Sequence, residues 1–127
     1  MNHPKVENIG KGRTIMGIVK QSEAAKATIA EGRTRFLAET DQLMTAVIDF
    51  SDGPTSAPDP PHSHPHEQIT YVAEGEIFFC IENEKHHLSA GDLFTVPGNV
   101  PHSVQLLTDK VRLVDTFTPI REDFRQS

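Results

Sequence analysis

The stretch HSHPHEQITYVAEG, residues 62–75, carries the strongest signal in this sequence. In an extended chain alternate residues share a face. Four polar residues of the stretch have the same parity: His62, His64, His66 and Gln68. Imidazole is the commonest protein ligand for zinc, nickel, copper and iron, and His102 is spaced to supply a further ring from a neighbouring strand. The alternative is a solvated histidine-rich loop, because Pro61 and Pro65 cannot donate to a sheet ladder.

Short runs rich in β-branched and aromatic residues surround this stretch, with turn residues between them. The strands we expect are 43–50, 67–72, 76–81, 86–88, 93–96, 102–107 and 111–118. The ambiguous stretch 21–31 is interpreted as a loop that passes into a strand at about 28–40, and residues 51–61 as a turn-rich loop too short to separate two domains. The pattern indicates an all-β sandwich or barrel, with residues 1–127 as one domain and a metal-binding core at about 43–118.

Composition excludes several classes of function. The 127 residues carry 12 basic and 18 acidic side chains, a net charge of −6, so we expect no binding to nucleic acid or to a membrane surface. The N-terminal stretch MNHPKVENIGKGR lacks the apolar core of a signal peptide, which favours the cytoplasm over a mature periplasmic chain. Cys80 is the single cysteine, so no internal disulfide can form, and we expect it to be a buried hydrophobe.

Two motifs in this sequence resemble those of the cupin superfamily. HSHPHEQITYVAEG resembles the first motif, with Gln68 where a Glu is usual, and GDLFTVPGNVPH, residues 91–102, resembles the second. Asn99 replaces the second glycine of that motif, and Asn tolerates a positive φ. The fifteen residues between Gly75 and Gly91 match the spacing of small bacterial cupins. The resemblance implies a single-domain jelly-roll barrel, a double-stranded β-helix, with a metal ion inside.

Gln68 bears on the chemistry of such an ion. Three neutral imidazoles and an amide leave the charge of a divalent ion uncompensated, which favours a Lewis acid. Iron oxygenases usually keep a carboxylate among the metal ligands, so Gln68 weighs against oxygen chemistry. Zinc, nickel, manganese and iron all suit this ligand set. His66 could compete for the position of Gln68, although a supporting or exposed histidine is the favoured interpretation.

The C-terminal segment offers candidate catalytic groups. On a strand Asp115 and Phe117 share a face, and an acid at the end of an apolar strand is a candidate for proton transfer. Arg121, beyond a proline turn, could fork onto a substrate carboxylate. The alternatives are a strand-end turn residue for Asp115 and a surface ion pair for Arg121.

The ending DTFTPIREDF, residues 115–124, is similar to that of the pectin-degradation cupins grouped with KdgF, as is the stretch 62–76. Members of that group convert 4,5-unsaturated monouronates into linear keto-uronates. The resemblance implies one divalent metal ion held by four ligands: His62, His64, Gln68 and His102. It also implies that Asp115 and Arg121 are catalytic and that Phe117 binds substrate. Thr70 stands where some members have a further polar side chain in the substrate site.

Three functions are consistent with this sequence. The first is the uronate ring opening, on a small acidic sugar. The second is an iron- or copper-dependent dioxygenase of a small organic substrate, and the third is a non-catalytic cupin that binds a sugar or an effector. By analogy with small cupins we also expect a homodimer.

Overall fold

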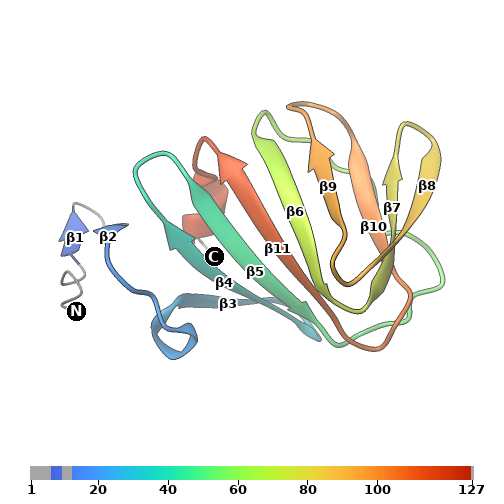
Figure 1. Ribbon diagram of the computed structural model, residues 1–127, viewed down its shortest axis with the longest axis horizontal. Helices are drawn as coiled ribbons and strands as arrows, with labels where there is room; N and C mark the ends of the chain where they lie inside the picture. The colour runs from blue at the N-terminus through green and yellow to red at the C-terminus, as the bar shows by residue number, and fades with distance from the viewer. Residues whose placement is uncertain (1–6, 10–12, 127) are drawn as a thin grey trace.

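The computed structural model describes residues 7–9 and 13–126, which form eleven strands and two short 3₁₀ helices (Figure 1). In chain order the elements are β1 (Glu7–Ile9), β2 (Arg13–Met16), η1 (Gln21–Glu23), β3 (Ala25–Ala30), β4 (Arg33–Glu39), β5 (Met44–Phe50), β6 (Glu67–Glu74), β7 (Glu76–Ile81), β8 (Glu84–Ser89), β9 (Leu93–Val96), β10 (His102–Leu106), β11 (Val111–Thr118) and η2 (Glu122–Gln126). The all-β prediction is confirmed.

The strands form two main antiparallel sheets and a small β1–β2 hairpin. The larger sheet has the order β3-β4-β5-β11-β6-β9, and the smaller has the order β10-β7-β8. β11 lies between β5 and β6, so a strand near the C-terminus joins two strands from the middle of the chain. Figure 1 shows the smaller sheet beyond β6 and β9, with η2 near the opposite end of the larger sheet.

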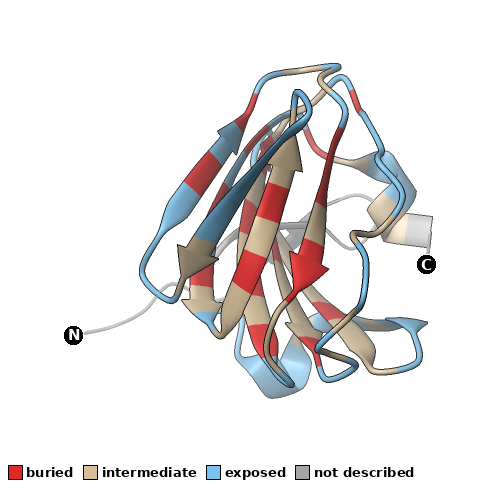
Figure 2. Cartoon of the chain, turned by 90° about the vertical axis from the view of Figure 1, so that its right-hand side faces the viewer, coloured by how far each residue is buried: buried red, intermediate tan, exposed pale blue. Residues whose placement is uncertain are grey.

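The core lies between the two sheets because apolar residues alternate along the strands. Residues of β11 are buried at every second position, from Val111 to Phe117, and Figure 2 shows the same banding on neighbouring strands. Phe79 of the smaller sheet stacks on Phe94 of the larger one, with 3.9 Å between ring centroids. Burying side chains of this size stabilises a domain by about 1.5–3 kcal/mol each, which holds the sheets face to face.

The expected strands match closely in the second half of the chain. β7, β9 and β11 have the predicted bounds. β4 lies within the strand expected at about 28–40, but the expectation of a loop before it is wrong, because a separate strand, β3, precedes it. That region is the β3–β4 hairpin, and Gly32 turns it with a φ of 78°. Cys80 is half-buried rather than buried, because it points away from the core on β7.

The long connection between β5 and β6 lies beside β10 and ends in the histidine stretch. The backbones of His62 and His102 exchange two hydrogen bonds, of 3.0 and 2.9 Å, which brings the two histidine segments together. The expectation about the N-terminal stretch falls largely on residues 1–6 and 10–12, which lie outside the described part. Across residues 7–9 and 13–126, none of the helices has the length and apolar character needed to span a membrane. That the whole chain forms one domain stays a prediction.

Candidate metal centre

Three histidine rings meet inside the fold. His102 is the first residue of β10, His62 pairs with it through the backbone bridge, and His64 lies two residues further towards β6. Their candidate ligand nitrogens all lie within 4.8 Å of one another. The ring centroids of His62 and His102 are 4.4 Å apart, and those of His64 and His102 are 5.0 Å apart. Such a group, with three convergent nitrogens, is positioned for a metal ion.

His64 and His102 are buried, and backbone carbonyls orient their rings. Nδ1 of His102 lies 2.8 Å from the carbonyl oxygen of Val100, which makes Nδ1 the protonated nitrogen and leaves a lone pair on Nε2. That buried Nε2 has no hydrogen-bond partner among the described residues. A buried, unpartnered imidazole nitrogen is costly, and a metal ion would satisfy it.

His64 supports the same conclusion more strongly. Its Nδ1 lies 3.0 Å from the carbonyl oxygen of His66, and its Nε2 lies 3.0 Å from Oε1 of Gln68. A neutral imidazole has one N–H, so it can donate to only one of these two oxygen acceptors. The other contact then brings two lone pairs together, and a cation between Nε2 and Oε1 would relieve their repulsion. The residues present therefore fit a metal ion.

The three rings are kept neutral. Burial lowers the pKa of His102 and of His64, and the nearby Arg121 guanidinium lowers both further. The His62 side chain is more exposed, yet desolvation, followed by the charges of His102 and His64, also lowers its pKa. Metal binding needs the neutral imidazole, so these shifts favour metal binding at neutral pH.

Gln68, Thr70 and Asp115 form a buried chain of hydrogen bonds beside the histidine triad. The chain crosses from β6 to β11, where Asp115 pairs with Thr70 in the strand register. Nε2 of Gln68 donates to Oγ1 of Thr70 over 2.8 Å, and that hydroxyl donates to Oδ1 of Asp115 over 2.6 Å. The arrangement turns Oε1 of Gln68 towards His64. Burial, partly offset by the Thr70 hydrogen bond and the charge of Arg121, raises the pKa of Asp115 to about 6.

Arg121 and Phe117 complete the wall of a pocket of about 200 Å³ that His62, His102 and Asp115 also line. The guanidinium of Arg121 lies 5.3 Å from the ring centroid of Phe117, and its Nη2 donates to Asp123 over 2.8 Å. Phe117 is buried and meets the His64 ring edge-on, 5.7 Å away. A guanidinium and a buried acid therefore share a small pocket with two histidines of the triad, His62 and His102.

Comparison with known proteins gives the family. Residues 50–117, more than half of the chain, match the cupin domain family. This chain is a cupin. It is 38% identical over 93 residues to the pectin degradation protein KdgF of Dickeya dadantii, a match covering 72% of this chain and 82% of that protein.

Solved structures agree with this assignment. An RmlC-like cupin from Shewanella frigidimarina superposes with a TM-score of 0.74 at 34% identity, over 84% of this chain and 93% of that one. KdgF from a Halomonas species superposes with a TM-score of 0.73 at 32% identity, over 83% and 94% of the two chains. The predicted cupin fold is confirmed.

The cupin brings together the residues that the sequence singled out. Gln68, Thr70, Asp115, Phe117 and Arg121 all lie around the triad, and Thr70 is fully buried. His66 lies outside the triad, with its ring centroid 5.6 Å from that of His64. Whether each residue acts as a metal ligand, a catalyst or a substrate contact stays a prediction.

Sequence reasoning missed three residues that line the same pocket, Arg33, Asp59 and Phe124. Phe124 lies against Arg121, with its ring centroid 4.0 Å from the guanidinium carbon. The sequence offered one indication of a role for Phe124, namely its position three residues after Arg121. Arg33 and Asp59 gave none, because their pairing links residues 26 positions apart.

Proposed function

We propose that this cupin is a metal-dependent enzyme that converts 4,5-unsaturated monouronates into the linear keto-uronate. One observation carries the proposal: a buried acid, Asp115, and a guanidinium, Arg121, line one pocket together with His62 and His102 of the triad. The likeness to KdgF supplies the substrate class. At about 200 Å³ the pocket is smaller than the ~300–1,000 Å³ typical of drug-sized ligands, which suits a single sugar ring.

We propose that His62, His64 and His102 hold the ion and that Gln68 is its fourth ligand through Oε1. When bound, a divalent ion such as zinc, nickel, manganese or iron supplies Lewis-acid polarisation of substrate oxygens. Thr70 accepts a 2.8 Å hydrogen bond from the amide of Gln68. This contact holds the Gln68 side chain in one conformation, with Oε1 facing the metal site. Thr70 is also a predicted substrate contact.

The reaction is an isomerisation, so every atom of the substrate is retained. The hemiacetal C–O bond of the ring opens to give an aldehyde and an enol, with the hemiacetal hydroxyl proton passing to the former ring oxygen. As the enol hydroxyl then releases a proton, the enol becomes a ketone by taking up a proton at its carbon. We assign that proton to Asp115. Both hydrogen bonds recorded for its carboxyl end on Oδ1, which leaves Oδ2 to hold and deliver it. A pKa of about 6 for Asp115 lets the carboxyl exchange protons near neutral pH.

Arg121 and Phe117 would orient the substrate. A guanidinium pairs with a carboxylate through two parallel hydrogen bonds, and Arg121 is restrained by the Phe117 and Phe124 rings. The face of Phe117 is available for the apolar side of a sugar ring. The surrounding buried side chains exclude water from the proton on Asp115.

The test is turnover of 4,5-unsaturated galacturonate by the metal-loaded protein, followed by loss of the ultraviolet absorbance of the conjugated double bond and by NMR of the product. Asp115→Asn should abolish turnover and keep the metal content of the wild type. If the loaded wild type leaves the substrate unchanged, or D115N remains fully active, the proposed reaction is wrong. Oxygen uptake with ferrous ion would instead indicate a dioxygenase.

We also propose that the cupin acts as a cytoplasmic homodimer. The outer face of the larger sheet exposes three large apolar side chains on β6 and β9: Ile69, Tyr71 and Leu93. A cluster of this kind is more typical of an interface than of a free surface. Light scattering coupled to size exclusion tests the dimer, and cell fractionation tests the compartment.

A further inference from the structure

His62 depends on a loop for its position. His102 begins a strand of the smaller sheet, whereas His62 ends the connection from β5, residues 51–61, and is the exposed member of the triad. That connection lies along the edge of β10. The N–H of Thr55 donates to the carbonyl of Leu106 over 2.9 Å, and the N–H of Asp59 donates to that of Val104 over 3.0 Å.

The last part of the connection is a stiff spacer. Its sequence is Pro58-Asp59-Pro60-Pro61-His62, and each proline fixes φ near −65°. A residue that precedes a proline is confined to extended conformations, which applies to Asp59 and Pro60. Proline-rich segments act as semi-rigid spacers of about 3.1 Å per residue. The place of Asp59 therefore helps to set the place of His62, three residues later, in addition to the two backbone hydrogen bonds between His62 and His102.

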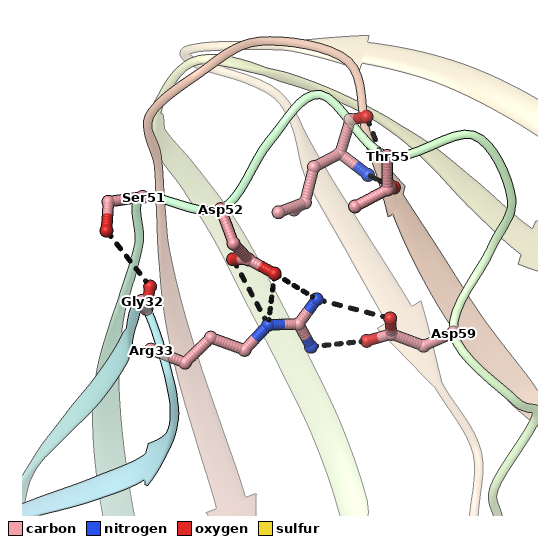
Figure 3. A network of polar contacts seen from close by, with 7 residues as sticks. Gly32, Arg33, Ser51, Asp52, Thr55 and Asp59 are labelled. Carbon is pink, nitrogen blue, oxygen red and sulfur yellow. Dashed lines mark hydrogen bonds and ion pairs between the residues drawn. The ribbon is translucent and has the colours of Figure 1, made fainter.

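A single guanidinium holds Asp59 and the beginning of the same connection. Arg33, at the start of β4, donates to Asp59 through Nη1 over 2.7 Å and through Nη2 over 3.2 Å (Figure 3). Its Nε donates to Asp52 over 3.1 Å, and its guanidinium carbon lies 5.0 Å from the centroid of the Phe50 ring. The Arg33 side chain is only 17% exposed, and its contacts with Asp59 are partly buried.

The carboxylates of Asp52 and Asp59 meet two different edges of the Arg33 guanidinium, as Figure 3 shows. The Ser51 hydroxyl reinforces the junction by donating to the carbonyl of Gly32 over 3.3 Å. The connection is thereby tied to the β3–β4 hairpin near both of its ends. Bidentate guanidinium–carboxylate pairs add geometric precision as well as energy, which is what a positioned metal ligand requires.

We propose that Arg33 is a positioning residue for the metal centre: by clamping Asp59 it fixes the proline spacer and so presents His62 to the ion. Arg33 does not touch the triad, and its effect passes through Asp59 and the two following prolines. The proposal needs only the triad and holds whatever reaction the cupin catalyses.

Simple electrostatics predicts the opposite effect of removing Arg33. A positive charge near the pocket repels a metal cation, so its loss would tighten metal binding, and its retention as lysine would change nothing. Positioning predicts weaker binding for both changes, because neither methionine nor lysine can make the fork to Asp59. For R33M, electrostatics predicts tighter metal binding and positioning predicts weaker binding. For R33K, electrostatics predicts no change and positioning again predicts weaker binding.

The experiment measures the zinc dissociation constant of the full chain by competition with a chromophoric chelator, in Arg33→Met, Arg33→Lys and the wild type. Arg112→Met and Arg112→Lys are matched controls. Arg112 forms a comparable fork, 2.7 and 2.8 Å to Asp49, on the outer face of the same sheet. Thermal unfolding of each zinc-free variant shows whether it folds.

Both Arg33 variants should bind zinc about tenfold more weakly, the effect expected when a supporting contact behind a metal ligand is lost, and both Arg112 variants should match the wild type. Tighter binding by R33M with unchanged binding by R33K would overturn the proposal in favour of electrostatics. Three other results would also overturn it. They are unchanged zinc binding in all variants, equal weakening in the Arg33 and Arg112 variants, and no zinc binding by the wild type. Zinc binding is measured without substrate, so failure of the uronate reaction alone leaves the proposal standing.

Discussion

Replacing Asp115 with asparagine should make the cupin more stable at neutral pH while it removes activity. Burial raises the pKa of Asp115 from 3.8 to about 6. Between these values the folded chain holds a proton that the unfolded chain has released, so the free energy of unfolding falls as pH rises through this window. Above about pH 6 the destabilisation caused by the buried carboxylate is constant. A difference of about two pKa units corresponds to about 3 kcal/mol in the free energy of unfolding.

The amide reproduces the shape of the carboxyl without its charge. Its oxygen can accept the Thr70 hydroxyl, which lies 2.6 Å from Oδ1 of the native acid. D115N should therefore unfold with a free energy about 3 kcal/mol above that of the wild type at about pH 7.5, and the gain should disappear below about pH 4, where the wild-type carboxyl is neutral in both states.

The assay is urea unfolding of chelator-treated protein at the two pH values, because a bound cation would itself stabilise the carboxylate. Asp49→Asn is a control variant for which we expect the opposite change in the free energy of unfolding. The fork from Arg112 lowers the pKa of Asp49 at the surface, so removal of that charge should destabilise the cupin at neutral pH. A D115N variant that is less stable than the wild type near pH 7.5, or whose gain does not change with pH, refutes the reasoning from burial.

Three further outcomes test the site. His102→Ala should abolish stoichiometric zinc binding by elemental analysis, whereas His86→Ala, an exposed ring on β8, should leave it intact; retained binding in H102A would contradict the triad. Arg121→Lys should raise KM for the unsaturated uronate about tenfold with little change in kcat, because lysine cannot form two parallel hydrogen bonds to a carboxylate. A lower kcat with unchanged KM would contradict a carboxylate-binding role. Chelation should abolish turnover and added zinc should restore it, whereas activity that survives chelation would show that the reaction needs no ion.

The strands and the triad were predictable because local pattern determines both. Alternation along β11 placed Asp115 and Phe117 on the inner face, and the two motifs brought His102 to His62 and His64. The alternation rule placed Gln68 correctly because β6 is regular from Glu67 to Val72.

The β3–β4 hairpin and the Arg33 clamp were not predictable in this way. The strand before Gly32 is mostly exposed, so no apolar alternation marks it, and one glycine after an acid is a weak turn signal. The partners of Arg33 depend on where the connection after β5 crosses the sheet. No local pattern encodes that path.

The amide at position 68 and the acid at position 115 are best understood together. Nε2 of Gln68 lies 3.5 Å from Oδ1 of Asp115, so a carboxylate in place of the amide would put two buried acids side by side. Two such acids repel each other's ionisation at neutral pH, and they would share one proton between the proposed metal ligand and the proposed proton carrier. An amide avoids this conflict because it offers Oε1 to the metal site and an N–H to the acid. Asp115 is then the single ionisable group of the Gln68–Thr70–Asp115 chain, which is the condition that the proton transfer assigned to it requires.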